Sequence, residues 1–196
     1  MHFSSDTGAE AAAGTFSIVV ICTGNQIRSP AVEGFLQHFT YDLPVVVCSA
    51  GVLDGGGVGA YPAAVDAAAR WGIDLARHRS RSLREVSLAD ADLVLGFERQ
   101  HVARAVVDGG AASERTFILS ELVDLLELGA PHEEGDPRVR ARSAVARAEA
   151  LRSRGGVIPL VREIRDPMGR RARDVRDTVD AVGDLSRKLV EGLFGR

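Results

Sequence analysis

The sequence has few cysteines and no long apolar run, and each shortage excludes a class of protein. Two cysteines in 196 residues cannot form the disulfide framework of a small secreted domain, and they favour a reducing compartment. No apolar stretch is long enough for a transmembrane helix, and residues 1–15 lack the basic start and apolar core of a signal peptide. We therefore expect a cytoplasmic protein with no membrane partner and a disordered tail over residues 1–15.

The sequence also lacks a charge excess and a metal-ligand cluster. Its 24 basic and 27 acidic residues give a formal charge of −3, which provides no drive toward nucleic acid. Histidine and cysteine do not recur at metal-ligand spacing, so we expect neither a metal nor another cofactor. The length is that of a single domain, which we place at residues 16–196.

One stretch near the N-terminus carries the residues of a catalytic site. An apolar run over residues 18–21 ends in Cys22, and Arg28 and Ser29 follow after a short loop. A buried strand would deliver the cysteine to this loop, which would lead into a helix N-terminus. Inward-pointing backbone N–H groups and the partial positive charge of the helix start favour an oxyanion and a thiolate. Arg28 adds a planar, permanently charged fork that suits phosphate oxygens.

The other residues of the loop fit the same chemistry. Gly24 and Asn25 tolerate the unusual backbone angles that inward-pointing amides require, and Ser29 can donate a hydrogen bond to a thiolate. The sequence therefore predicts a cysteine-based phosphatase. The structural alternative is a buried cysteine at the end of a strand, beside a solvated arginine.

The rest of the chain alternates short apolar runs with amphipathic stretches, which is typical of βαβ units. We expect an α/β three-layer sandwich with a four-stranded parallel sheet and helices on both faces. Ligands of such sheets bind at the carboxyl ends of the strands, where Cys22 would lie. The expected strands are residues 18–22, 45–48 (short and buried), 91–96 and 116–119, and the expected helices are residues 30–40, 62–71, 98–107, 120–128 and 170 onward.

Residues 130–156 are expected to form an added basic helical segment within this domain. Asp136 would be its N-cap, with Pro137 at the first helical position. The segment holds six arginines and few large apolar residues. We interpret it as a peripheral helix with a solvated face, and a docking surface for an acidic partner is the alternative.

A cysteine phosphatase also needs an acid that protonates the departing oxygen. Two Asp-Pro pairs compete for this role, at Asp136 and at Asp166. Helix capping already explains Asp136, whereas Pro167 would hold Asp166 in an extended conformation that presents its carboxyl outward. Asp166 is therefore the predicted acid, and in a second step it would activate water.

The loop resembles the signature of the low-molecular-weight protein tyrosine phosphatases in the run Cys22-Thr23-Gly24-Asn25-Gln26-Ile27-Arg28-Ser29-Pro30. The similarity covers most of residues 16–129 and 157–192. It implies hydrolysis of phosphate monoesters, above all protein phosphotyrosine, without a metal and through a thiophosphoryl-cysteine intermediate. The catalytic residues would be Cys22, Arg28 and Asp166. The substrate-binding residues would be Thr23, Gly24, Asn25, Gln26, Ile27 and Ser29.

Three supporting residues follow from the resemblance alone. In the family, an asparagine in an unusual backbone conformation is held by a serine after the second strand and by a histidine further on. Asn25, Ser49 and His78 occupy the matching positions. The resemblance therefore implies that these three residues hold the loop in shape.

The sequence departs from the family pattern at the places that set substrate choice. Gln26 stands where the family usually has Ile, or Thr in its phosphoarginine-specific members, and Ile27 stands where a second cysteine is common. The aromatic cleft residues of typical members are absent. Phosphoarginine, phosphoserine or a small phosphate ester therefore stay open as substrates. So do an arsenate reductase-like enzyme, for which Cys48 on its buried strand is poorly placed, and a non-catalytic module that binds phosphorylated residues.

Overall fold

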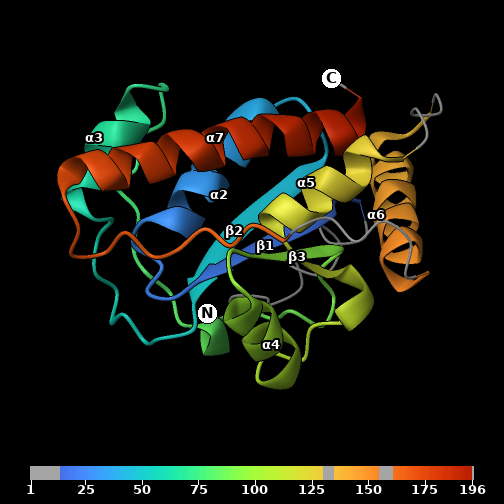
Figure 1. Cartoon of the computed structure of the whole chain (residues 1–196), viewed down its shortest axis with the longest axis horizontal. Coiled ribbons are helices and arrows are strands. Elements are labelled where there is room, and N and C mark those ends of the chain that lie inside the picture. The colour runs from blue at the N-terminus through green and yellow to red at the C-terminus, as the bar shows by residue number, and fades with distance from the viewer. Residues whose placement is uncertain (1–13, 130–134, 155–160, 196) are drawn as a thin grey trace, which may run out of the picture.

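The computed structural model describes residues 14–129, 135–154 and 161–195, which form a four-stranded sheet in the order β2-β1-β3-β4 (Figure 1). All neighbouring strands are parallel. The predicted α/β sandwich with a four-stranded parallel sheet is therefore confirmed. The strands are β1 (Phe16–Cys22), β2 (Val45–Gly51), β3 (Leu93–Gly96) and β4 (Thr116–Ile118).

The inner strand β1 is buried on both faces, as its uninterrupted apolar run predicts. Ile18 and Val20 point into the larger of two core clusters, and Val19 and Ile21 point into the smaller one on the opposite face. Since successive side chains of a strand point to opposite faces, this one segment supports both layers of helices.

Helices cover both faces of the sheet. The smaller cluster holds side chains of α4 and of the 3-10 turn η1, and the larger one holds side chains of the remaining α-helices. Figure 1 shows α7 running along one side of the sheet over α2, with α4 on the other side. The α-helices are α2 (Arg28–Phe39), α3 (Pro62–Ala69), α4 (Arg99–Val107), α5 (Leu119–Glu127), α6 (Pro137–Ser153) and α7 (Ala172–Phe194), and the 3-10 turns are η1 (Leu83–Glu85) and η2 (Ser113–Arg115).

The register of the strands assembles one functional edge. Cys22 pairs with Gly51 at the end of β2, and Val20 pairs with Leu95 near the end of β3. The loops that follow these three strands therefore lie side by side at the carboxyl edge of the sheet. Loops at this edge are where parallel α/β sheets bind their ligands.

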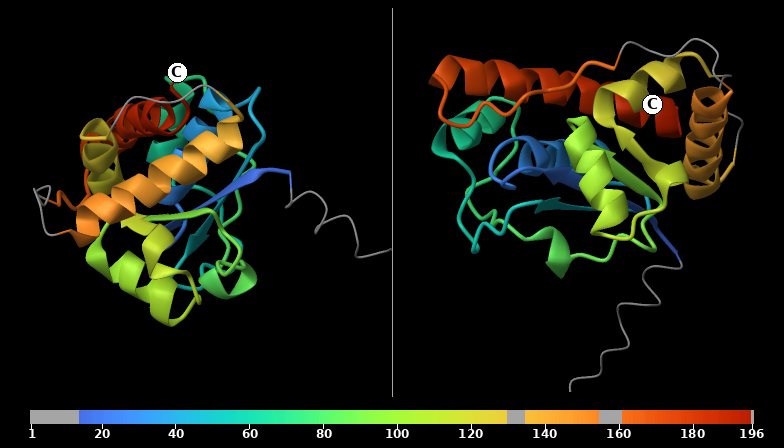
Figure 2. Two further views of the ribbon diagram at one scale, coloured as in Figure 1. Left: turned by 90° about the vertical axis from the view of Figure 1, so that its right-hand side faces the viewer. Right: turned by 60° about the horizontal axis from the view of Figure 1, so that its bottom comes forward.

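The basic helix α6 has the solvated face expected of a peripheral helix, and its opposite face is bound to the rest of the chain. It buries Ala141, Ala144, Val145 and Ala148 in the core, and Figure 2 (left) shows it crossing in front of the other elements. Four of its arginines bind other parts of the chain, where they donate to backbone carbonyls and to one carboxylate. These contacts are Arg138 to the Gly14 carbonyl, Arg140 to the Phe194 carbonyl, Arg142 to Asp92, and Arg152 to the Thr116 carbonyl.

The structure also tests the expectations for the second strand and for the Asp136 cap. The strand expected to be short and buried is longer, and it is an edge strand: Val46 of β2 is 51% exposed. Asp136 caps α6 as predicted, because its side chain accepts a hydrogen bond from the Arg138 N–H. The expected disordered tail lies outside the described residues except for residues 14 and 15, as do residues 130–134 and 155–156 of the added segment. No described helix has the length and apolar character needed to cross a membrane.

Candidate active site

The loop between β1 and α2 wraps around the sulfur of Cys22. Cys22 is buried, and its Sγ accepts hydrogen bonds from the Asn25 N–H at 3.2 Å and from the Ser29 hydroxyl at 3.0 Å. Both donors stabilise a negative charge on the sulfur, as does the start of α2 that the loop leads into. The sulfur of Cys22 therefore lies among groups that complement negative charge.

Asn25 holds the loop in shape. It is the one described non-glycine residue with a positive φ, 51°, and its side chain is fully buried. Its Nδ2 donates to the hydroxyls of Ser29 at 2.9 Å and Ser49 at 2.7 Å, and its Oδ1 accepts from the Arg81 N–H at 2.9 Å. A left-handed residue costs free energy unless its surroundings fix it, and these contacts supply that fixation.

His78 completes this arrangement from the other side of the loop. Its Nε2 lies 2.8 Å from the Asn25 carbonyl oxygen. Burial lowers the pKa of His78, which favours the neutral ring, so Nε2 carries the proton and donates to that carbonyl. Asn25, Ser49 and His78, which the resemblance singled out, therefore do meet in the structure.

Arg28 is buried and points back under the loop. Its Nη1 pairs with Glu98 at 2.5 Å and donates to the Ile164 carbonyl at 2.8 Å. Its Nη2 pairs with Asp166 at 2.6 Å and donates to the Thr23 hydroxyl at 3.0 Å. The Nε is buried and has no hydrogen-bond partner within the described part of the chain. A buried donor without a partner is costly, and an acceptor at this N–H would relieve that cost.

The cysteine, the arginine and Asp166 surround one small cavity of about 150 Å³. A cavity of this size admits a phosphoryl group but not a large ligand. Asp166 stands at its mouth, 33% exposed, where its Oδ1 accepts a hydrogen bond from the Met168 N–H at 3.0 Å. The cavity is lined by Cys22, Thr23, Gly24, Gln26, Ile27, Arg28, Leu53, Asp166 and Met168.

The structure divides the expected substrate-binding residues into two groups. Four of them line the cavity: Thr23, Gly24, Gln26 and Ile27. Asn25 and Ser29 are fully buried behind the loop, where their side chains hold the backbone and the sulfur. Their side chains act on a ligand through Cys22 and through the shape of the loop.

The competing Asp136 lies far from this cavity. It caps α6 and pairs with Arg138, which also binds the Gly14 carbonyl just before β1. Residues before β1 lie at the amino edge of the sheet, whereas Cys22 lies at the carboxyl edge. Hydrogen bonds from Arg138 lower the pKa of Asp136 to about 2, so this carboxyl stays ionised near neutral pH.

Sequence reasoning missed two residues that hold Arg28 and its neighbours. Glu98 and His101 follow β3, and His101 is fully buried. Burial, and then the charge of Arg28, lower the pKa of His101 to about 4, so the ring is neutral at working pH. Its Nδ1 accepts from the Phe97 N–H at 3.3 Å, which leaves the proton on Nε2, 3.2 Å from the Thr23 hydroxyl oxygen. The sequence marks these two residues only by their position after a predicted strand, whose carboxyl end lies at the same edge of the sheet as Cys22.

Glu33 and Arg81 were missed as well, and they support the loop from α2 and from the segment before η1. Glu33 accepts a hydrogen bond from the Ser49 hydroxyl and pairs with Arg81 at 3.2 Å. Nothing in the local sequence marks either residue, since each acts through a partner far along the chain. Within the described residues, no cluster of three or more His, Cys, Asp or Glu side chains suits a metal ion.

The two cysteines lie on opposite faces of the sheet. Cys22 belongs to the larger core cluster, whereas Cys48 packs against the smaller one beside Val19, its neighbour in register. Both thiols are free, and burial raises the pKa of Cys48. Cys48 is therefore not placed to exchange with the Cys22 sulfur, as the resolving thiol of an arsenate reductase would have to.

A parallel α/β sheet with a cysteine, an arginine and an aspartate around a phosphate-sized cavity at its carboxyl edge defines a class of cysteine-dependent phosphatases. Residues 17–148 match the model of the low molecular weight phosphotyrosine protein phosphatases, and the chain belongs to that family. The chain is therefore a cysteine-dependent phosphatase.

Relatives of known name agree with this assignment. The chain is 34% identical over 122 residues to the low molecular weight protein-tyrosine-phosphatase Etp of Escherichia coli K12, a match over 60% of this chain and 78% of that protein. Among solved structures it is similar to the low molecular weight protein tyrosine phosphatase of T. tengcongensis, with a TM-score of 0.65 and 27% identity over 90% of this chain and 99% of that one. It is also similar to the YwlE arginine phosphatase of Geobacillus stearothermophilus, with a TM-score of 0.64 and 27% identity over 90% and 91% of the two chains.

Proposed function

We propose that the chain hydrolyses phosphorylated tyrosine in proteins, with Cys22 as nucleophile, Arg28 as phosphate ligand and Asp166 as acid and base. The observation that carries the proposal is the cavity that Cys22, Arg28 and Asp166 line together, with a buried Arg28 Nε that has no hydrogen-bond partner among the described residues. A phosphoryl oxygen supplies the acceptor that this N–H lacks. The proposed setting is a reducing compartment such as the cytoplasm, because the nucleophile must stay a free thiol.

In the first step, the Cys22 thiolate attacks phosphorus opposite the ester oxygen. The S–P bond forms as the P–O bond to the substrate breaks, and the departing oxygen takes a proton from Asp166. The three equatorial oxygens accept hydrogen bonds from the amides of residues 23–28 and from Arg28, which stabilise the charge of the transition state. The product of this step is a thiophosphoryl-cysteine.

In the second step, water attacks the same phosphorus. The carboxylate of Asp166 takes a proton from the water, the P–S bond breaks, and the sulfur leaves as a thiolate. The Ser29 hydroxyl and the Asn25 N–H, which contact the sulfur, stabilise it as a leaving group. Inorganic phosphate then departs, and Asp166 is protonated again for the next cycle.

Substrate entry must change the ion pair that closes the site. Asp166 and the phosphoryl group compete for the same guanidinium, since Asp166 holds Nη2 of Arg28 at 2.6 Å. A phosphate dianion carries the larger charge, so it takes over Arg28 and leaves Asp166 facing the ester oxygen. Once released from Arg28, the carboxylate takes up a proton from water and lies where an acid is needed.

Phosphoarginine is the second candidate substrate. Leu53 and Met168 stand at the mouth of the cavity, 59% and 42% exposed, and no aromatic side chain lines it among the described residues. Aliphatic walls suit the stem of an arginine as well as they suit an aromatic ring. Solved relatives named arginine phosphatases are 25–27% identical to this chain.

A substrate panel tests the proposal. Wild type and Cys22→Ser are compared on p-nitrophenyl phosphate, phosphotyrosine, phosphoarginine, phosphoserine and sugar phosphates. We expect hydrolysis by the wild type alone, fastest on phosphotyrosine. A preference for phosphoarginine would establish the second candidate. Phosphate binding without turnover in either protein would mean a binding module instead of an enzyme.

A further inference from the structure

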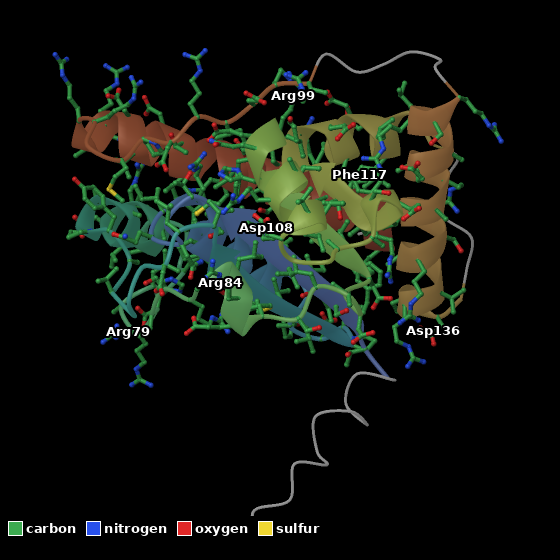
Figure 3. All side chains as sticks on the ribbon, turned by 90° about the horizontal axis from the view of Figure 1, so that it is seen from below. Arg79, Arg84, Arg99, Asp108, Phe117 and Asp136 are labelled. Atoms are coloured by element: carbon green, nitrogen blue, oxygen red, sulfur yellow. The ribbon has the colours of Figure 1, made fainter. Side chains whose placement is uncertain are left out.

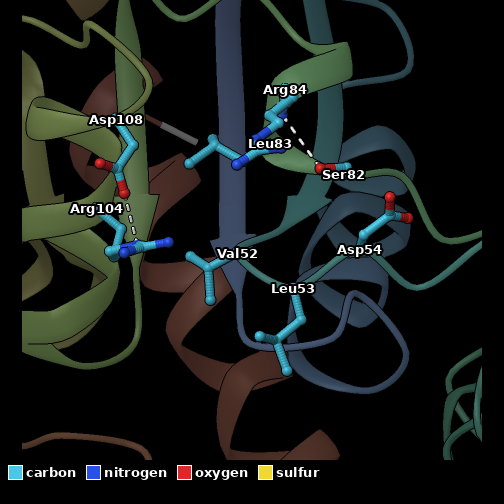
Figure 4. A pocket seen from close by; sticks show the side chains of 8 residues that line it. All are labelled: Val52, Leu53, Asp54, Ser82, Leu83, Arg84, Arg104 and Asp108. Carbon is cyan, nitrogen blue, oxygen red and sulfur yellow. Dashed lines mark hydrogen bonds and ion pairs between the residues drawn. The ribbon is translucent and has the colours of Figure 1, made fainter.

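A second and larger hollow lies beside the phosphate cavity, with a volume of about 560 Å³ (Figure 4). It is framed by the loop after β2, by η1 with the serine before it, and by α4. Figure 3 shows two of its residues, Arg84 and Asp108, on the face of the molecule opposite α7. The lining residues are Val52, Leu53, Asp54, Ser82, Leu83, Arg84, Arg104 and Asp108.

The hollow has an apolar floor and a charged rim. Leu83 is 6% exposed and belongs to the smaller core cluster, and the partly buried Val52 packs against that cluster. The charged side chains of Asp54, Arg84 and Arg104 stand around these two residues. An apolar surface ringed by polar groups is typical of a binding groove.

The hollow adjoins the catalytic cavity. Leu53 lines both, and its side chain, 59% exposed, forms the ridge between them. A phosphoryl group fits within the smaller cavity of about 150 Å³, so the part of a substrate beyond its phosphate ester can cross Leu53 into the larger one. A small phosphate ester is too short to fill the larger hollow as well, whereas a polypeptide is long enough to reach it.

Some charged side chains of the rim have partners within the protein, and one does not among the described residues. Arg104 and Asp108 pair with each other at 2.6 Å, and Asp54 accepts a hydrogen bond from the Gly56 N–H at 3.1 Å. Arg84 is exposed and forms no ion pair with any described residue. Its guanidinium is the cation that the rim offers to an incoming carboxylate.

We propose that this hollow binds the polypeptide that flanks the phosphorylated residue, with an apolar side chain on Val52 and Leu83 and an acidic one at Arg84. The substrate class is then a phosphorylated protein with acidic and apolar residues near the modified one. This proposal rests on the proposed phosphatase activity of the neighbouring cavity.

Steady-state kinetics with matched substrates test the groove. The phosphoamino acid preferred in the substrate panel is used as its blocked monomer, in a nine-residue peptide with flanking Glu and Leu, and in one with flanking Lys and Ser. The test variant is Arg84→Glu, and the control is Arg115→Glu. Arg115 directly precedes β4 and so lies at the amino edge of the sheet, away from Cys22 at the carboxyl edge. All proteins are also assayed on p-nitrophenyl phosphate, which fills the catalytic cavity alone.

We expect the wild type to prefer the Glu/Leu peptide over both the blocked monomer and the Lys/Ser peptide. Arg84→Glu should lower kcat/KM for the Glu/Leu peptide about five- to tenfold through KM, because an exposed attraction becomes a repulsion. It should leave p-nitrophenyl phosphate kinetics unchanged, and Arg115→Glu should leave all substrates unchanged.

Two failures are distinguishable. Equal kcat/KM for the monomer and both peptides, or an equal loss in Arg84→Glu and Arg115→Glu, would overturn the groove and leave the phosphatase activity standing. Wild type that hydrolyses neither p-nitrophenyl phosphate nor any phosphoamino acid would overturn the proposed function, and the groove with it.

Discussion

Arg28 is the proposed phosphate ligand, and contacts within the chain hold its side chain in place. Glu98, Asp166, Thr23 and a backbone carbonyl hold both of its terminal nitrogens, and only its Nε is left without a described partner. A long side chain would otherwise lose much conformational entropy on binding phosphate. Because these contacts have already fixed the guanidinium, that loss does not recur when substrate enters.

Asp166→Asn tests the acid. We expect kcat on phenyl phosphate to fall by about 100-fold or more, because an amide cannot protonate the departing oxygen. The loss should be smaller on p-nitrophenyl phosphate, whose leaving group needs less protonation. Inhibition by inorganic phosphate should persist, since the change removes a negative charge that competes for Arg28. Unchanged turnover of phenyl phosphate would exclude Asp166 as the acid.

At the scale of elements, the end of β2 supports the catalytic loop through close packing. A Cβ on Gly51 would lie 3.0 Å from the Thr23 carbonyl oxygen and 3.1 Å from the Asn25 nitrogen. Both neighbours are backbone atoms, which cannot turn away as a side chain could. The loop and β2 therefore approach as closely as they do only because residue 51 is glycine.

Gly51→Ala tests this approach. We expect the methyl group to displace the loop amides and to lower kcat/KM on p-nitrophenyl phosphate about tenfold or more, since small misplacements of a binding site are costly. Gly59→Ala is the matched control, because a Cβ there meets nothing closer than 3.8 Å. Circular dichroism should show both variants folded. Wild-type kinetics in Gly51→Ala would contradict the role of this contact.

Another element-level device is the contact of α6 with the edge strand β4. Arg152 donates to the carbonyls of Thr116 and Ser113 at 2.9 and 2.8 Å, and its guanidinium lies 4.0 Å from the centre of the Phe117 ring. An edge strand exposes carbonyls that would otherwise need water or another chain. The helix therefore covers one edge of the sheet with an arginine in place of a further strand.

Arg152→Ala should lower the free energy of unfolding by about 2 kcal/mol, from two lost hydrogen bonds and the contact with the ring. Denaturant titration measures the change. Arg173→Ala is the control: this exposed residue pairs with Asp177 on α7, and its loss should cost less than about 0.5 kcal/mol. Catalysis should be unaffected in Arg152→Ala, since Thr116 begins β4 at the amino edge of the sheet. Equal stability of the two variants would show that the contact of Arg152 with β4 does not stabilise the fold.

At the scale of the whole molecule, the buried His101 and the half-buried His78 make stability depend on pH. The pKa of His101 is lowered to about 4 from 6.5, chiefly by burial, and the pKa of His78 is lowered in the same direction. The unfolded chain therefore takes up protons, in the range between pH 6.5 and 4, that the folded chain refuses. Stability is full above pH 6.5 and falls as the pH decreases through this range.

We expect acidification from pH 6.5 to 4 to remove about 3 kcal/mol through His101 alone. Denaturant titrations at a series of pH values measure the slope. His101→Asn should flatten the slope in this window, whatever its effect on stability at pH 7. If the free energy of unfolding of His101→Asn depends on pH as strongly as that of the wild type, His101 is not the group whose lowered pKa causes the dependence.

The fold was predictable because its signals are local. An apolar strand run, a glycine-containing loop and an amphipathic helix repeat along the chain, and each pattern follows from residues a few positions apart. Element boundaries were less exact: α2 begins at Arg28 and α7 at Ala172, each two residues from the expected start. Residues at helix ends obey capping and packing together, and the packing is not visible in the local pattern.

What the sequence determined by itself is the parallel α/β fold with the Cys22 to Ser29 loop after its first strand, and from the sequence Asp166 is predicted over Asp136 as the acid. Each depends on neighbouring residues: a strand end, an Asp-Pro pair, a helix cap. Only the tertiary structure decided that Glu98, His101, Glu33 and Arg81 support the site, that α6 is bound to the sheet, and that a groove adjoins the phosphate cavity. These features depend on contacts between side chains that are far apart in the sequence. The register of the parallel strands determines which of these side chains lie close together.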